Sequence, residues 1–134
     1  MRAQTEGSVL VVEDDPTLAH ALDRNLSVRG YTTSCASTVA EAIAAVTRDP
    51  PALLLLDIDL PDGSGWEVLR IIRSGEYPDT AVIVVSALQP NPRLVAELHV
   101  SAVLEKPFPM ESLLRQVGVL LGGSPRADFL SSPS

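Results

Sequence analysis

Residues 53–65 read Leu-Leu-Leu-Leu-Asp-Ile-Asp-Leu-Pro-Asp-Gly-Ser-Gly, an apolar run followed by acidic residues and a turn. An apolar run of this length without alternating polar positions is typical of a strand in a sheet that is covered on both faces. Pro61, Asp62 and Gly63 are turn-forming residues, so the strand ends near Asp57. The stretch therefore predicts a buried parallel strand that carries Asp57 at its end.

The same pattern recurs along the chain. Four more apolar runs of strand length lie at residues 9–12, 31–36, 81–85 and 102–104. Helical spacing of apolar residues follows Pro16, a Thr-Val-Ala-Glu capping box at residues 38–41, Gly65 and Pro109. Alternating strands and helices predict an α/β fold, in which a doubly wound five-stranded parallel sheet has helices on both faces.

Prolines and glycines set the ends of two of the expected helices. Pro90 and Pro92 delay the fourth helix until about Arg93 and leave room for roughly two turns. We therefore expect a shortened fourth helix. Gly122 and Gly123 are expected to end the last helix.

The length and composition indicate one aliphatic domain. A chain of 134 residues is of the size that forms a single core. Hydrophobic residues make up 46% of the chain and aromatic residues 4%, so the core should consist of Val, Leu, Ile and Ala. We expect a lead-in at residues 1–7 and the domain at residues 8–121. Residues 122–134 are rich in Gly, Ser and Pro and are expected to be a flexible tail or the start of a linker.

Charge and apolar patterning exclude several classes of partner. The net charge is −7 and no stretch gathers Lys and Arg, so this domain alone is not expected to bind nucleic acid. No apolar run approaches the roughly 18 residues that cross a bilayer, so no membrane partner is expected. Residues 1–8 lack the apolar core of a signal peptide, and Cys35 has no second cysteine to pair with. We therefore expect a cytoplasmic protein in which Cys35 is a small core residue.

Four of the five predicted strands are followed by a residue that can do chemistry. Glu13 and Asp14 follow the first strand, Asp57 the third, Ser86 the fourth and Lys106 the fifth. Parallel strands end at one edge of the sheet, which is where open α/β sheets bind ligands. We therefore expect these five side chains to meet at one site.

A cluster of three carboxylates requires a positive partner. Like charges about 4 Å apart repel by roughly 4 kcal/mol at an effective dielectric near 20. Mg²⁺ fits, because it binds oxygen ligands and needs only one or two carboxylates together with phosphate oxygens. Calcium would need a larger cage of protein oxygens, and soft metals are disfavoured because Cys35 lies within a strand and neither histidine follows one.

These residues suit phosphoryl transfer to a carboxylate. Such a transfer asks a protein mainly to position groups and to neutralise charge. Asp57 would be the nucleophile, Lys106 would supply a point charge, and the Ser86 hydroxyl would donate a hydrogen bond. Lys106 is the single lysine of the chain, against nine arginines.

The chain resembles the receiver domain of two-component response regulators from about residue 8 to residue 121. The first strand and acidic pair of that family are similar to Val-Leu-Val-Val-Glu-Asp-Asp-Pro at residues 9–16, and its phosphorylation loop is similar to residues 53–65. Val-Ile-Val-Val-Ser-Ala at residues 82–87 resembles the strand that carries its Ser or Thr. Leu-Glu-Lys-Pro-Phe at residues 104–108 resembles its Lys-Pro-Phe turn.

The resemblance implies a role for each site residue. Asp57 would be the phospho-acceptor in a Mg²⁺-dependent reaction. Asp14 would bind the metal directly and Glu13 largely through water, while the backbone carbonyl of Asp59 would complete the protein ligands. Asp15, which precedes Pro16, is either part of the acidic group or the cap of the first helix.

The resemblance also implies a fold, a switch and partners. The strand order would be the flavodoxin-like 2-1-3-4-5, Pro107 would follow a cis peptide bond, and the small Ala87 would leave a path for the phospho-donor. The donor would be a histidine kinase or a phosphotransfer protein, and the output a downstream protein or a fused domain. Such a domain is not an enzyme beyond assisting its own phosphorylation and dephosphorylation.

The sequence departs from the family between Ser86 and Lys106. This segment is about two residues shorter than usual, and Val103 stands where the family carries a Tyr or Phe that reports phosphorylation. A run of His, Val and Ser at residues 99–101 replaces the common Gly-Ala-Asp. We therefore expect neither the usual aromatic relay nor the common mode of dimerisation.

Two alternatives remain open. A degenerate receiver would act as a scaffold without being phosphorylated, which the missing aromatic residue favours and the intact site residues oppose. A phosphatase of the haloacid dehalogenase type is similar in its Asp-x-Asp signature, which Asp57 and Asp59 match. Against it stand Pro61, the acidic pair that precedes rather than follows the nucleophile, and the short chain.

Overall fold

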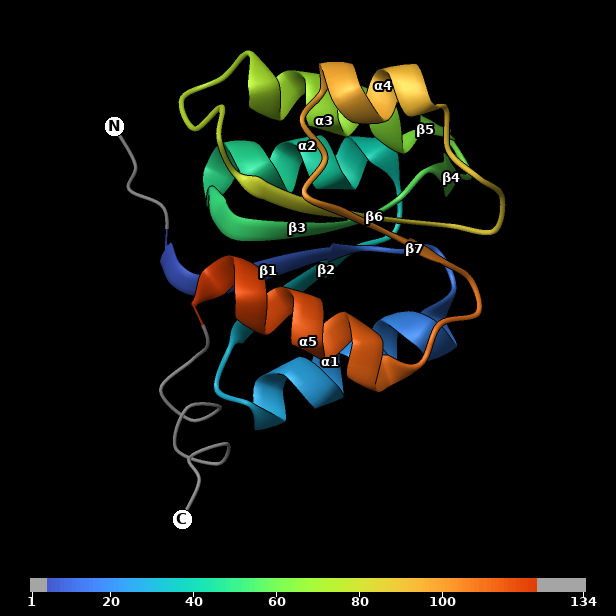
Figure 1. Cartoon of the computed structure of the whole chain (residues 1–134). Coiled ribbons are helices and arrows are strands. Elements are labelled where there is room, and N and C mark those ends of the chain that lie inside the picture. The colour runs from blue at the N-terminus through green and yellow to red at the C-terminus, as the bar shows by residue number, and fades with distance from the viewer. Residues whose placement is uncertain (1–4, 123–134) are drawn as a thin grey trace.

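The computed structural model describes residues 5–122 and contains one parallel five-stranded sheet (Figure 1). Its strands are β1 (Thr5–Val12), β2 (Thr32–Ala36), β3 (Pro51–Asp57), β6 (Ala81–Ser86) and β7 (Ala102–Glu105). They are arranged in the order β2-β1-β3-β6-β7, and every neighbouring pair is parallel. Because β6 and β7 are the fourth and fifth strands of this sheet, the predicted order is confirmed.

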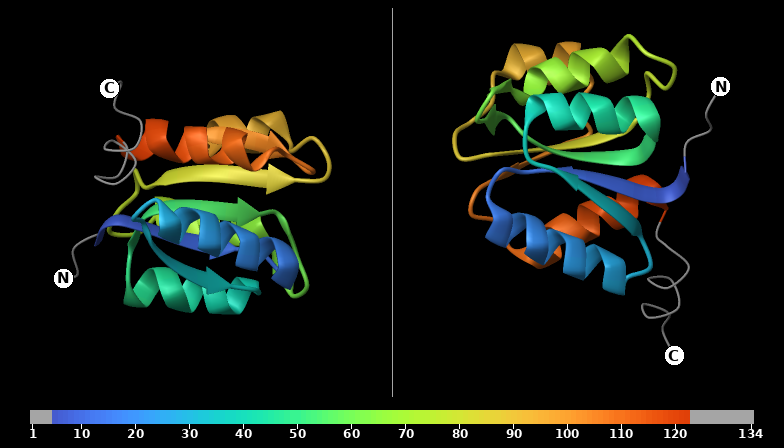
Figure 2. Two further views of the ribbon diagram at one scale, coloured as in Figure 1. Left: turned by 90° about the horizontal axis from the view of Figure 1, so that it is seen from below. Right: turned by 180° about the vertical axis from the view of Figure 1, so that it is seen from behind.

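Helices cover both faces of the sheet. They are α1 (Pro16–Val28), α2 (Val39–Arg48), α3 (Gly65–Arg73), α4 (Pro92–Glu97) and α5 (Met110–Leu121). Helices α2, α3 and α4 lie on one face and α1 and α5 on the other, an arrangement that the view from behind also shows (Figures 1 and 2). The expected doubly wound fold with a short fourth helix is therefore confirmed.

The two layers of core come from alternate residues of the central strands. Leu54 and Leu56 of β3 pack beneath α2 and α3, whereas Leu53 and Leu55 pack against α1 and α5. All four are at most 2% exposed. Since side chains of a strand point alternately to opposite faces, a run of four leucines serves both layers at once.

Side-chain caps fix where the helices begin. The Asp15 carboxylate accepts a hydrogen bond from the Thr17 amide (3.0 Å), so Asp15 is the cap of α1 and Pro16 its first residue. Thr38 accepts from the Glu41 amide (3.0 Å), but the Glu41 carboxylate accepts from the Ser37 amide instead of closing the expected box. Gly122 follows α5 with φ 71°, the left-handed conformation that ends a helix.

Some details differ from the sequence prediction. A hairpin of β4 (Asp59–Leu60) and β5 (Gly63–Ser64) follows β3, and β1 begins four residues before the predicted run at residues 9–12. Cys35 is exposed rather than part of the core, because it lies on an edge strand. Residues 1–4 of the expected lead-in and residues 123–134 of the expected tail lie outside the described part of the chain.

None of the helices within residues 5–122 has both the length and the apolar character needed to cross a membrane.

Candidate functional site

The carboxyl ends of four strands meet at one edge of the sheet, as predicted. Glu13 follows β1, Asp57 ends β3 and Ser86 ends β6, and each of these residues is at most 5% exposed. Asp14 is exposed beside them, and Lys106 follows β7. The polar side chains therefore lie together at one edge of the sheet, beyond the apolar core.

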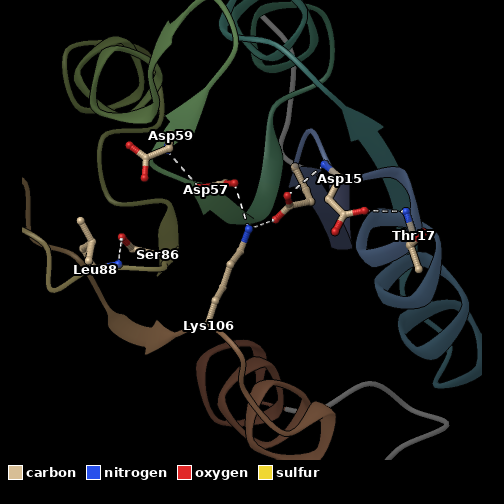
Figure 3. A network of polar contacts seen from close by, with 8 residues as sticks. Asp15, Thr17, Asp57, Asp59, Ser86, Leu88 and Lys106 are labelled. Carbon is tan, nitrogen blue, oxygen red and sulfur yellow. Dashed lines mark hydrogen bonds and ion pairs between the residues drawn. The ribbon is translucent and has the colours of Figure 1, made fainter.

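Lys106 joins the first and third strands through its ammonium group. Its Nζ atom lies 2.7 Å from Oε1 of Glu13 and 3.0 Å from Oδ2 of Asp57. Figure 3 shows the Lys106 side chain pointing toward Asp57. The Lys106 amide donates to the Ser86 carbonyl oxygen (2.8 Å), and the peptide bond before Pro107 is cis, as the resemblance implied.

Backbone amides hold the other oxygen of each buried carboxylate. The Asp59 amide donates to Oδ1 of Asp57 (3.0 Å), and the Asp15 amide donates to Oε2 of Glu13 (3.1 Å). Hydrogen bonds to charged groups are stronger than those between neutral groups. Both carboxylates are thus fixed in orientation by the main chain and by one shared ammonium.

The site alters the proton affinity of two of its groups. Burial raises the pKa of the Glu13 carboxyl above its usual value, although the contacts with Lys106 and the Asp15 amide act in the opposite direction. Burial lowers the pKa of Lys106, but Glu13 and Asp57 together outweigh it, so the pKa of Lys106 lies above its usual value. The ammonium therefore stays charged at neutral pH.

The carboxylates are arranged in a way that fits Mg²⁺. One oxygen each from Glu13, Asp14 and Asp57 lies within 4.8 Å of the others. Three negative charges against the one ammonium leave two uncompensated, the charge of a divalent cation. Mg²⁺ usually takes only one or two protein carboxylates and keeps several waters, so this group of three offers enough oxygen ligands for it. Within residues 5–122, Oε1 of Glu13 has the ion pair with Lys106 but no well-formed hydrogen bond.

The other residues singled out from the sequence lie at the end of β6, on β7 and just beyond β3. Oγ of Ser86 accepts a hydrogen bond from the Leu88 amide (3.2 Å; Figure 3). Ala87 is exposed at the start of the loop that leads to α4. Val103 on β7 is 37% exposed, and the Asp59 side chain is exposed beyond β3.

Gly65 and Asp62 make contacts that the sequence analysis did not predict. A methyl group added at Gly65 would lie 2.3 Å from the Asp57 carbonyl oxygen, so the first turn of α3 approaches the acceptor closely only because residue 65 is glycine. Asp62, interpreted as turn chemistry, accepts hydrogen bonds from the Val39 and Ala40 amides and so caps α2. Glycine at a helix start and acid in a turn are too common to indicate such contacts.

A cleft of about 510 Å³ adjoins the site between α1 and the segment that follows β7. Asp15 and Leu18 line one side, and Lys106 and Phe108 line the other. A second hollow of about 230 Å³ lies between the ends of α2 and α3 and contains none of the site residues.

Comparison with known proteins places this geometry in a family. The response regulator receiver domain family matches residues 9–118. The transcriptional regulatory protein KdpE of Mycobacterium tuberculosis is 37% identical over 127 residues, which is 93% of this chain and 55% of KdpE. The response regulator MprA of Mycobacterium leprae is 38% identical over 115 residues, or 84% of this chain and 50% of MprA.

Solved structures agree with the sequence comparison. A CheY-like receiver domain protein from Methanospirillum hungatei superposes with a TM-score of 0.81 at 26% identity, covering 86% of this chain and 93% of that one. The non-phosphorylated HemR receiver domain of Leptospira biflexa gives 0.79 at 28% identity, covering 87% and 95%. This chain spans about half the length of the curated relatives it matches. It belongs to the response regulator receiver domain family.

Proposed function

We propose that this receiver domain accepts a phosphoryl group on the carboxylate of Asp57 in a Mg²⁺-dependent reaction. The observation that supports this most directly is the ammonium of Lys106 held between two buried carboxylates beside a third. A purely structural ion pair would not need the third, exposed carboxylate of Asp14. Bound Mg²⁺, held by Asp14, Asp57, the Asp59 carbonyl and, through water, Glu13, would neutralise charge on the transferred group.

The chain's own residues would do the rest of the chemistry. Asp57 supplies the attacking oxygen, and the Asp59 amide keeps its carboxylate oriented. Lys106, already 3.0 Å from the acceptor, supplies positive charge to a phosphoryl oxygen. The Ser86 hydroxyl, at the neighbouring strand end, donates a hydrogen bond to another phosphoryl oxygen.

We further propose a histidine kinase or a phosphotransfer protein as the donor. The cleft beside Lys106 and α1 is open to a protein partner, and the exposed Ala87 adds no bulk on the other side of the acceptor. The phosphorylated domain would then act on a downstream protein or on a fused output domain. Membership of the receiver family removes the basis for the phosphatase alternative, whose acidic metal pair follows the nucleophile.

Intact-mass spectrometry after incubation with acetyl phosphate and Mg²⁺ tests the proposal. An adduct of about 80 Da is expected in the wild type, and it should be absent from Asp57→Asn and after the metal is chelated. Asp59→Asn is the matched control. It removes a carboxylate two residues away but keeps the backbone carbonyl, so this variant should still form the adduct.

A short-lived phosphoaspartate would escape mass detection, so binding of beryllofluoride with Mg²⁺ is the second measurement. Beryllofluoride binding to the wild type but not to Asp57→Asn would support the proposal. If the wild type gives neither adduct nor binding, the domain is a degenerate receiver that acts as a scaffold.

A further inference from the structure

The two ends of α4 are attached to the protein in different ways. At the C-terminal end, Leu98 is 8% exposed and packs into the core. Ser101, which follows, makes two hydrogen bonds with Val82 of β6, one from its amide (2.9 Å) and one to its hydroxyl oxygen (3.0 Å). Helix α4 has no fully buried residue, and only the partly buried Leu94 packs from it against the core, so its position depends largely on what holds its ends.

Arg73, the last residue of α3, clamps that C-terminal end. Its Nε donates to the Leu98 carbonyl oxygen (2.7 Å) and its Nη2 to the His99 carbonyl oxygen (3.1 Å). Its Nη1 donates to the carbonyl oxygens of Pro78 (2.7 Å) and Thr80 (2.8 Å), just before β6. Four hydrogen bonds from one planar guanidinium thus join three segments through main-chain atoms.

Within residues 5–122, the N-terminal end of α4 has only local hydrogen bonds. Asn91 caps the helix locally by accepting from the Arg93 amide (2.9 Å). Residues 87–89 are exposed, and Leu88 is 76% exposed although it is apolar. The Leu88 amide donates to Oγ of Ser86, so this loop is tied directly to a side chain of the phosphorylation site.

From this asymmetry we propose that Arg73 makes the C-terminal end of α4 a fixed pivot, so that switching moves only the loop at residues 87–91 and the first turn of α4. This inference rests on the proposed function. When the Ser86 hydroxyl turns to a phosphoryl oxygen, its bond with the Leu88 amide is displaced. A six-residue helix is about 9 Å long, so a tilt about Leu98 displaces the Leu88 end most. Arg73 positions the moving element and takes no part in the chemistry.

Amide hydrogen exchange by NMR tests the clamp in the resting protein. In Arg73→Gln, exchange at Leu98, Val100 and Ser101 should rise about tenfold or more, the change expected on losing hydrogen bonds to a charged donor. Exchange at Leu88 should change less than about twofold, as should exchange at Leu54 of the central β3. A uniform rise at all these amides would show general destabilisation and would overturn the clamp.

Arg70→Gln is the matched control. Arg70 lies on the same helix and is exposed, and its side chain makes no hydrogen bond or ion pair within residues 5–122. The substitution therefore removes the same charge without touching α4 and should leave exchange at Leu98 and Ser101 unchanged. Arg73→Lys should be intermediate, because one ammonium cannot reach the carbonyls of both segments, residues 78–80 and 98–99. Equal effects of the Arg70 and Arg73 variants would contradict the proposal.

Beryllofluoride with Mg²⁺ then tests the pivot. In the wild type, amide shifts should change at Leu88 and Arg93 but hardly at Leu98 and Ser101, and in Arg73→Gln they should spread to the latter two. Wild-type changes at Leu98 as large as those at Leu88 would overturn the pivot. If beryllofluoride changed not even the Asp59 amide shift, the proposed function would be contradicted, and the pivot with it. Amide exchange in the resting protein would still show whether Arg73 clamps the C-terminal end of α4.

Discussion

Lys106 carries the positive charge that lies between the buried carboxylates of Glu13 and Asp57. Its Nζ atom is within 3.0 Å of an oxygen of each, and both carboxylates are nearly inaccessible to water. Removing one partner of a buried ion pair leaves an uncompensated charge, which costs more than the pair itself contributes. The resting site therefore depends on this single ammonium, and a bound cation can partly replace it.

We predict that Lys106→Met lowers the free energy of unfolding by about 1–3 kcal/mol in the absence of Mg²⁺. The estimate lies below the range for a fully buried pair because the Lys106 side chain is 23% exposed. Mg²⁺ should recover part of the loss by neutralising Glu13 and Asp57. Urea unfolding with and without Mg²⁺ measures both effects.

Arg48→Met is the control for that variant. Arg48 and Asp49 form an ion pair at 3.2 Å, but both side chains are about two thirds exposed. Such pairs contribute little, so the change should be less than about 0.5 kcal/mol and insensitive to Mg²⁺. A loss in Lys106→Met that Mg²⁺ does not reduce would contradict our view of the charge balance.

The sequence predicted which residues meet at the site but not how they pair. Glu13, Asp57 and Lys106 were expected together because they follow parallel strands, and the structure brings them together. Glu13, and not Asp14, pairs with the Lys106 ammonium because of where the backbone places the two residues. The Glu13 amide still donates to the Ala36 carbonyl oxygen of β2 (3.0 Å), which keeps Glu13 in the strand and leaves Asp14 outside it. A contact of this kind depends on three-dimensional packing.

At the scale of elements, the approach of α3 to the end of β3 depends on Gly65. A methyl group at this position would lie 2.3 Å from the Asp57 carbonyl oxygen and 3.1 Å from Cα of Ile58, and backbone atoms cannot move aside cheaply. We predict that Gly65→Ala destabilises the protein by about 1–3 kcal/mol, as overpacking of a core does. It should also weaken beryllofluoride binding, because Asp57 is displaced. Urea unfolding and a binding titration measure the two effects.

Gly118→Ala is the opposite case in the same protein. Gly118 lies inside α5, and a methyl group there would meet nothing within 4 Å. Alanine favours a helix over glycine, so this variant should gain about 0.5–1 kcal/mol. If both alanine variants shifted stability in the same direction, close contact at Gly65 would not be the reason for the glycine.

Asp62 connects the β4–β5 hairpin to α2 and gives the connection a pH dependence. Its carboxylate accepts from the Val39 amide (2.7 Å) and the Ala40 amide (3.1 Å), and the first of these bonds is the main cause that lowers the pKa of Asp62. A carboxyl with a lowered folded pKa stabilises the fold above its unfolded pKa. That stabilisation is lost as the pH falls through the folded value, which lies below 3.8.

We therefore predict that Asp62→Ala lowers the urea midpoint at pH 7 and that the difference from wild type shrinks as the pH falls below about 4. Asp62→Asn should lie between the two at pH 7, because an amide oxygen still accepts one hydrogen bond. The stabilisation that the Asn side chain of this variant provides should not depend on pH. Urea midpoints of the three proteins across a pH series measure this, and a difference that stays constant down to pH 3 would contradict the role of the charge.

Long elements were predictable and short ones were not. Strands with continuous apolar runs and helices with apolar spacing carry several residues of signal, and the prolines at residues 90 and 92 predicted a short α4. The β4–β5 hairpin has two residues per strand, too few to show any periodicity. Cys35 was placed in the core because it lies within a strand, although the strand order implied by the resemblance already put that strand at the edge of the sheet, where Cys35 is exposed.

At the scale of the whole molecule, two effects of magnesium must be separated. The chain carries a net charge of −7, so any salt reduces its self-repulsion and stabilises the compact state somewhat. A specific site acts differently, because a ligand that binds only the folded state adds stability that grows with the logarithm of its concentration. The carboxylates of Glu13, Asp14 and Asp57 are the group that would supply such a site.

We predict that Mg²⁺ stabilises the domain beyond NaCl of matched ionic strength, by about 1.4 kcal/mol at ten times the dissociation constant. Asp14→Asn should lose this excess, because it removes an exposed carboxylate of the cluster, and should keep the response to NaCl. Urea unfolding across both salt series measures it. Equal stabilisation by the two salts would assign the effect to screening of the net charge, and the three carboxylates would then not form a metal site.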